Sequence, residues 1–127
     1  MIKSITIKEP GMPYLTKLED ENGRSVVVNS SSKPSDYLSP AQLIQAGLAG
    51  CMSMTIKGML FKNKVSYNDV SVTVNLDETD GNYKFTYKVD VDSDEDSEKV
   101  DEIVKLGVSK CYVRNLITSD LTVEEAK

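Results

Sequence analysis

The sequence predicts an α+β fold in which antiparallel strands and long helices occupy separate parts of the chain. Two dipeptides that favour tight hairpin turns, Asn22-Gly23 and Asp80-Gly81, each lie between β-leaning segments. A long apolar segment, residues 40–62, lies between these hairpins and predicts a central helix. Because strand runs and helix runs are segregated, we expect antiparallel sheets packed against helices, as in α+β proteins.

Three short β-leaning runs open the chain. Asn22-Gly23 separates the second run from the third and predicts a hairpin between them. Residues 29–38 are polar, contain a proline and are typical of a loop. The apolar residues that define the three runs are Ile5 and Ile7, then Leu15 and Leu18, then 26–28.

The central helix is expected to run from Pro40 to about Lys62, with Ser39 as its N-cap and proline at the first helical position. Its first half is apolar on every face, which predicts burial on every face. Gly47 and Gly50 cost roughly 1 kcal/mol each against alanine, and they indicate that another backbone packs closely there. One chain with two modest sheets could not cover such a helix. We therefore expect a homodimer whose subunits wrap around each other's helices.

The second half of the chain begins with the clearest pattern. Apolar and polar residues alternate over 70–76 and again over 83–91, which predicts a hairpin with one apolar face. The acidic residues 92–96 suit the start of a second helix. Leu121 and Val123 are expected to add a last short strand. The buried stripe predicted for the second helix consists of Val100, Ile103, Val104, Gly107 and Cys111.

Composition excludes several classes of function. The chain has 127 residues, which fits one domain over 1–127, a net charge of -5 and no basic cluster, so nucleic acid and membranes are not expected partners. It has no histidine, and its two cysteines lie at no zinc spacing, so no metal or cofactor is expected. The N-terminus has no signal-peptide pattern, and the apolar stretch near 43–56 is judged too short for a bilayer. We therefore expect a cytoplasmic protein.

Cys51 and Cys111 allow two interpretations from composition and spacing. Free cysteine is often a small buried hydrophobe, whereas thiol chemistry needs a nearby cation and a route for substrate. The chain has two arginines. Arg114 follows Cys111 by three residues, close enough to share a helix face, and Arg24 follows the Asn-Gly turn, where a solvated role is equally compatible. The residues alone leave both interpretations open.

Two segments resemble motifs of a known family. The segment SPAQLIQAGLAGCMSMTI is similar to the first-cysteine motif of the OsmC/Ohr family (osmotically inducible protein C and organic hydroperoxide resistance protein). The segment SKCYVRNLI resembles the second-cysteine motif near the C-terminus of that family. The spacing, the length and the element order also agree, so the resemblance covers essentially the whole chain.

The resemblance implies an intertwined homodimer with active sites at the subunit interface, which reduces organic hydroperoxides without metal, haem or flavin. Cys51 would be the peroxidatic cysteine, which becomes a sulfenic acid, and Cys111 the resolving cysteine, which forms a disulfide with it. A dithiol such as a lipoyl group would restore both thiols. Arg24 matches the thiolate-stabilising arginine after the second strand.

The chain departs from the family pattern at two positions. Ala41 stands where the peroxidases carry a glutamate that pairs with the arginine, and Tyr112 stands where proline usually follows the second cysteine. Two alternatives therefore accompany the peroxidase hypothesis. One is a non-catalytic dimeric module that binds a small apolar or thiol ligand, and the other is a redox sensor whose disulfide alters a partner interaction.

Overall fold

The computed structural model describes residues 1–30 and 36–126. Residues 31–35 of the predicted loop therefore lie outside the described residues. The chain divides into two compact units, Met1–Ile44 and Gln45–Lys127, and the division falls within the first turns of the long helix. Each unit is described by itself below.

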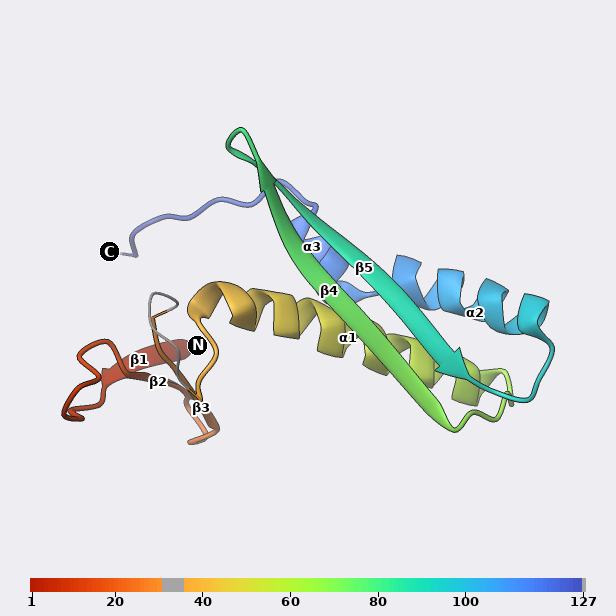
Figure 1. Cartoon of the computed structure of the whole chain (residues 1–127), viewed down its shortest axis with the longest axis horizontal. Helices are drawn as coiled ribbons and strands as arrows, with labels where there is room; N and C mark the ends of the chain where they lie inside the picture. The colour runs from red at the N-terminus through yellow and green to blue at the C-terminus, as the bar shows by residue number, and fades with distance from the viewer. Residues whose placement is uncertain (31–35, 127) are drawn as a thin grey trace. The chain divides into compact units, whose positions relative to one another are not determined.

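The first unit contains a three-stranded antiparallel sheet with strand order β1-β2-β3 (Figure 1). Leu18 in the central strand pairs with Ser4 on one side and Val26 on the other. The turn between the last two strands places Gly23 at φ +81°, a backbone conformation that favours glycine, so the hairpin predicted at Asn22-Gly23 is confirmed. The strands are β1 (Ile2–Thr6), β2 (Thr16–Asp20) and β3 (Ser25–Val28).

The long helix α1 spans Pro40–Lys62, as the sequence predicted. Ser39 caps it, because the Ser39 hydroxyl oxygen accepts a hydrogen bond from the Gln42 N–H at 3.2 Å. The Gln42 side-chain oxygen in turn accepts the Ser39 N–H at 2.9 Å. This reciprocal pair provides acceptors for two backbone N–H groups at the start of the helix, where no preceding helical carbonyl is present to accept them. The predicted start at Ser39-Pro40 is therefore confirmed.

The single chain covers α1 on one side only, as expected if a second subunit is needed to bury the helix on every face. One stripe of the helix is buried, whereas Met54 and Phe61 on the other side are 73% and 84% exposed. A Cβ atom built on Gly47 or Gly50 would meet nothing within 4 Å. The buried stripe consists of Leu48, Met52, Ile56 and Leu60.

The length of α1 also corrects the expectation that its apolar stretch is too short for a bilayer. Among the described residues it is the one helix long and apolar enough to cross a membrane, because it continues to Lys62. The core helix of a soluble protein passes the same test of length and composition. Its buried stripe belongs to the hydrophobic core of the second unit, and its other side is exposed in the single chain.

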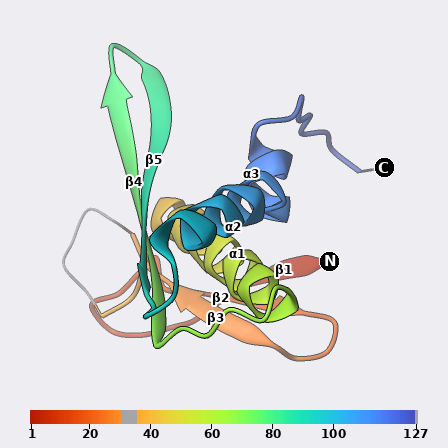
Figure 2. The same ribbon diagram turned by 90° about the vertical axis from the view of Figure 1, so that its right-hand side faces the viewer.

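The second hairpin covers the buried stripe of α1. Strands β4 (Asp69–Thr79) and β5 (Asn82–Asp92) pair antiparallel, with Val72 opposite Val89 and Leu76 opposite Phe85. Asp80 and Gly81 form the predicted turn, both at positive φ. Figures 1 and 2 show that α1 and the two C-terminal helices lie on the same side of this hairpin. The predicted apolar face is therefore the face that packs in the core.

Helix α2 (Ser97–Ser109) crosses α1 at very short range. A Cβ atom on Gly107 would lie 2.9 Å from Cγ1 and 3.0 Å from Cα of Ile56, which is closer than real Cβ contacts come. Glycine at this position therefore lets the two helices approach. The sequence indicated close packing at Gly47 and Gly50, but within the chain the close approach is at Gly107.

The C-terminal part differs from the prediction in two ways. Helix α2 ends at Ser109, so Cys111 lies outside it and is the N-cap of a further helix, α3 (Tyr112–Ile117). Its predicted burial with the α2 stripe is confirmed, since Cys111 belongs to the same core cluster. The chain turns there because the N–H of Lys110 bonds back to the carbonyls of the last helical turn. The strand expected at Leu121 and Val123 is also wrong, since both side chains are exposed and residues 119–126 contain no strand.

Candidate functional site

The structure brings Cys51 and Cys111 together. Cys51 lies near the middle of α1, directly before the buried Met52, and its side chain is half-buried. Cys111 lies between α2 and α3 and is completely buried. Both cysteines are free thiols, and Cys51 packs against the buried core cluster that contains Cys111. Residues 60 positions apart in the sequence therefore share one site.

The Cys51 sulfur also lies against the start of α3. The first N–H groups of a helix have no carbonyl partner within it, and those of Tyr112 and Val113 are among the groups that lower the pKa of Cys51. The Val113 N–H does most to hold the pKa of Cys51 below its ordinary value, and burial opposes this effect. Hydrogen bonds from Cys111, the Tyr112 N–H and Thr55 lower the pKa further. The site therefore favours the thiolate form of Cys51.

Cys111 shows the opposite behaviour. Burial raises the pKa of the Cys111 thiol, because an uncharged thiol loses less on leaving water than a thiolate does. The adjacent Cys51 sulfur raises it again, both as the acceptor of the Cys111 proton and as a nearby negative charge. Loss of one proton from the pair therefore leaves the charge on Cys51 and the remaining proton on Cys111.

Thr55 is a site residue that the sequence analysis missed. It follows Cys51 by one helical turn, and its hydroxyl donates a hydrogen bond to the Cys51 carbonyl at 2.8 Å. The spacing of four residues on a helix is a signal that could have identified it. The backbone donors of Tyr112 and Val113 carry no comparable signal, because any residue except proline provides an N–H.

Arg24 lies in the first unit and is described there. Its Nε atom forms an ion pair with the Asp20 carboxylate at 2.7 Å, and its side chain is 78% exposed. The same carboxylate accepts the N–H groups of Asn22 and Arg24, each at 2.9 Å, so it also stabilises the turn. Arg114, the other arginine, donates to the Asn115 side chain at 3.3 Å. The structure thus gives Arg24 a carboxylate partner, Asp20, that the sequence did not indicate.

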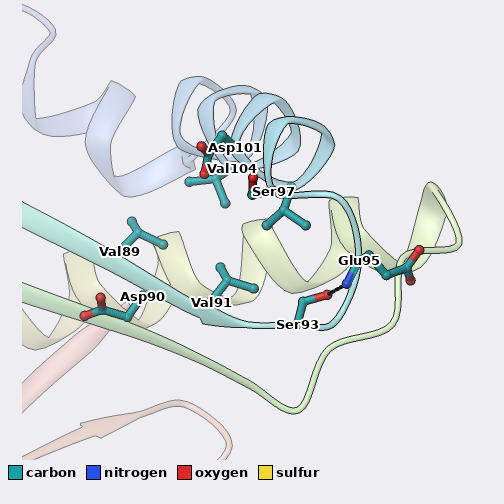
Figure 3. Close-up of a pocket in the computed structure, with 9 residues that line it drawn as sticks. Val89, Asp90, Val91, Ser93, Glu95, Ser97, Asp101 and Val104 are labelled. Atoms are coloured by element: carbon teal, nitrogen blue, oxygen red, sulfur yellow. Dashed lines mark hydrogen bonds between the residues drawn. The ribbon is translucent and has the colours of Figure 1, made fainter.

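A separate crevice of about 290 Å³ opens between the end of β5 and α2 (Figure 3). Ser93 and Glu95 shape its rim, where the Ser93 hydroxyl oxygen accepts the Glu95 N–H at 3.1 Å. Neither cysteine lines it. No group of three or more metal-binding side chains occurs among residues 1–30 and 36–126. The crevice is lined by Val89, Asp90, Val91, Ser93, Glu95, Ser97, Val100, Asp101 and Val104.

The cysteine pair lies within the part of the chain that matches a known family. Residues 33–126 match the family described as OsmC-like protein. The chain belongs to the OsmC-like family. Both cysteines and the whole of α1 fall inside the matched range, whereas Arg24 precedes it. No curated protein sequence matches this chain.

Solved structures share the fold of this OsmC-like chain at low sequence identity. The OsmC-like protein from Mycoplasma pneumoniae is 14% identical with a TM-score of 0.73, covering 92% of this chain and 85% of that chain. The organic hydroperoxide resistance protein OhrB of Bacillus subtilis is 19% identical with a TM-score of 0.62, covering 94% and 92%. An organic hydroperoxide resistance protein from Elizabethkingia anophelis is 14% identical with a TM-score of 0.66, covering 94% and 89%. The predicted α+β class is confirmed.

Replacement of Tyr112 by proline tests the backbone donors at Cys51. Proline is favoured at the first helical position, and Cys111 before it already has the extended backbone, φ −64° and ψ 117°, that a following proline requires. Tyr112→Pro therefore removes one N–H from the sulfur with little other change. We expect the pKa of Cys51 to rise, and its alkylation by iodoacetamide at pH 7 to slow roughly three- to tenfold, the effect of one hydrogen bond.

Tyr112→Ala is the matched control, since it removes the exposed side chain and keeps the peptide N–H. The rate of Cys51 alkylation should be followed against pH in both variants, with Cys111 replaced by serine so that one thiol reports. Equal curves for Tyr112→Pro and Tyr112→Ala would show that this N–H does not stabilise the thiolate.

Proposed function

We propose that this OsmC-like protein reduces organic hydroperoxides, with Cys51 as the peroxidatic and Cys111 as the resolving cysteine. The observation that carries the proposal is the packing of two free cysteines in one core, with their pKa values shifted in opposite directions. A structural pair of buried thiols has no need of three further donors around one sulfur. A nucleophilic thiolate beside a protonated thiol is the arrangement that two-step peroxide reduction requires.

In the first step the Cys51 thiolate attacks the terminal peroxide oxygen. The new S–O bond takes both electrons from sulfur, the O–O bond breaks, and the alkoxide leaves with the other electron pair. A proton from solvent converts the alkoxide to an alcohol. Cys51 is thereby oxidised to sulfenic acid, and the hydroperoxide is reduced by two electrons.

In the second step the Cys111 sulfur attacks the sulfur of the sulfenic acid. An S–S bond forms, the Cys111 proton and the departing hydroxide leave as water, and the pair ends as a disulfide. An external dithiol, for which a lipoyl group is our candidate, then reduces the disulfide by thiol–disulfide exchange and is itself oxidised to a cyclic disulfide. The packing of Cys51 against the core cluster that contains Cys111 supports this step.

We further propose that the working form is a homodimer. The face of α1 opposite its buried stripe exposes Met54 and Phe61 and carries three glycines with open space beside them, Gly47, Gly50 and Gly58. Cys51 is half-buried on the same helix. A second copy laid against this apolar face would cover it and would border the thiol. An apolar surrounding of this kind favours organic hydroperoxides over hydrogen peroxide.

Arg24 is the candidate cation for the thiolate or for the peroxide oxygens. Asp20 holds its Nε atom, so the side chain has a defined attachment without the family glutamate, whose position is Ala41 here. The proposed compartment is the cytoplasm, where reduced thiols persist. The net charge of -5 supports neither nucleic acid nor anionic membrane as a partner.

Titration with cumene hydroperoxide tests the proposal. One equivalent per chain should remove both free thiols together, with a Cys51–Cys111 disulfide identified by peptide mass spectrometry, and dihydrolipoamide should restore both. Hydrogen peroxide should react more slowly. Formation of the disulfide without turnover in dihydrolipoamide, together with a reversible change in a partner interaction, would favour the redox sensor. Stable loss of only one thiol would argue for two unrelated core cysteines. Retention of both thiols in excess hydroperoxide would overturn the peroxidase and favour the binding module.

A further inference from the structure

The backbone of Cys111 is fixed to the end of α2 and to the start of α3. Its N–H donates a hydrogen bond to the Val108 carbonyl in the last turn of α2 at 3.2 Å, and its carbonyl accepts the Asn115 N–H of α3 at 3.1 Å. The side-chain amide of Asn115 also donates to the Ser109 carbonyl at 3.1 Å, which ties α3 back to α2. A displacement of the last turn of α2 therefore moves Cys111 with it.

The same turn of α2 rests on α1 through Gly107. This glycine precedes Cys111 by four residues. The buried Ile56 that it meets follows Cys51 on α1 by five residues. A Cβ atom at Gly107 would lie 2.9 Å from the Ile56 Cγ1 and 3.0 Å from its Cα, a backbone atom that no side-chain rotation can move away. The crossing has room for the hydrogen of glycine but not for a methyl group.

We propose that Gly107 is a positioning residue that sets the approach of Cys111 to Cys51 for the resolving step. Cys51 lies on the same helix as Ile56, whereas Cys111 moves with the end of α2. The depth of the crossing therefore controls how closely the two cysteines approach. A disulfide needs their Cα atoms within about 7 Å, so an outward shift of α2 acts directly on this step. This inference rests on the proposed peroxidase function and adds a residue that serves its second step.

The two steps of the reaction depend on the crossing to different degrees. In the resolving step the Cys111 sulfur attacks the sulfur of Cys51 sulfenic acid. The S–S bond forms as the S–O bond breaks, and the departing hydroxide takes the Cys111 proton and leaves as water. The first step needs only Cys51 and the hydroperoxide. A methyl group at Gly107 should therefore impair the second step far more, since a misplacement of about 1 Å can slow a reaction about a hundredfold.

The alternative is that Gly107 serves packing alone. In that case Gly107→Ala would change the stability of the fold without a selective effect on the resolving step. Val100→Ala is the matched control, because Val100 is buried in the same core on the same helix. It removes atoms from this packing and adds none at the crossing, so it lowers stability alone.

The experiment oxidises the full chain with one equivalent of cumene hydroperoxide and follows two quantities. These are the rate of hydroperoxide consumption and the lifetime of Cys51 sulfenic acid, which a dimedone-type probe traps. We expect Gly107→Ala to lengthen this lifetime about a hundredfold. Its hydroperoxide consumption should slow by no more than about tenfold, the effect of one hydrogen bond, because the start of α3 moves with Cys111. Val100→Ala should match the wild type in both quantities.

Asn115→Ala is a second variant, which loosens the connection of α3 to α2 and changes an exposed side chain only. It adds no atom at the crossing. We expect it to lengthen the sulfenic acid lifetime about three- to tenfold, through loss of the hydrogen bond to Ser109. If Gly107→Ala does not fold, a wild-type lifetime in Asn115→Ala would overturn the proposal.

The outcomes separate this inference from the proposed function. Equal sulfenic acid lifetimes in Gly107→Ala and the wild type would overturn the role of Gly107 and leave the peroxidase intact. Diamide forms the disulfide without hydroperoxide, because it takes two electrons and two protons from the thiol pair and becomes the corresponding hydrazine. A wild-type protein that consumes no hydroperoxide would overturn the peroxidase, and slower disulfide formation by diamide in Gly107→Ala would still support the positioning role.

Discussion

Cys51→Ser is expected to abolish the consumption of cumene hydroperoxide in the presence of dihydrolipoamide. A serine hydroxyl at this position keeps its proton at neutral pH, so the donors around the Cys51 sulfur have no thiolate to stabilise. The loss should reach the uncatalysed background. The measurement is peroxide remaining over time, with circular dichroism to show that the variant is folded.

Cys111→Ser is the matched variant, because it changes the other member of the pair. It should consume one equivalent of hydroperoxide in a single turnover and then accumulate Cys51 sulfenic acid, detectable with a dimedone-type probe. Turnover with dihydrolipoamide should be strongly reduced. The roles assigned to the two cysteines would be reversed if Cys111→Ser abolished the first turnover and Cys51→Ser did not.

Met54→Lys is expected to convert the proposed homodimer to a monomer. Met54 is 73% exposed in the single chain, on the face of α1 that a second copy would cover. A lysine ammonium buried there without a partner would cost several kcal/mol, enough to lower dimer affinity by orders of magnitude. Sedimentation equilibrium at micromolar concentration measures the change.

Ser71→Lys is the control, because Ser71 is exposed on β4 and alternates with core residues such as Val70 and Val72. It introduces the same charge on the outward face of the hairpin and should leave the oligomeric state unchanged. A wild-type protein that is monomeric at micromolar concentration would contradict the dimer directly. Equal dissociation by both variants would show a general effect of charge instead of an interface at α1.

Local sequence signals determined most of the secondary structure. Ser39, Pro40 and Gln42 define the start of α1, and Asp80-Gly81 defines the turn of the second hairpin, because capping and turn chemistry act over a few residues. The motifs around Cys51 and Cys111 likewise point to these two residues, through their resemblance to the OsmC/Ohr family. Their roles in the reaction remain predictions.

Periodicity was misleading where the chain changes direction. The stripe from Val100 to Gly107 is real. Its extension to Cys111 assumed that the helix continues that far, whereas α2 ends at Ser109. By contrast, the apolar pattern of α1 predicted that one chain cannot cover this helix, and the exposed Met54 and Phe61 agree with it. Cover by a second copy stays a prediction. A periodic pattern states which residues prefer burial, but not which other surface covers them.

The sequence by itself determined the α+β class, the strands and hairpins, the bounds of α1 and the pair of cysteines to consider. Only the tertiary structure decided that Cys51 and Cys111 pack in one core, that the start of α3 lowers the pKa of Cys51, and that Asp20 holds Arg24. The physical reason is range. Caps, turns and alternation depend on neighbours in the chain, whereas the pKa of a thiol depends on the donors that α2 and α3 bring to it through space.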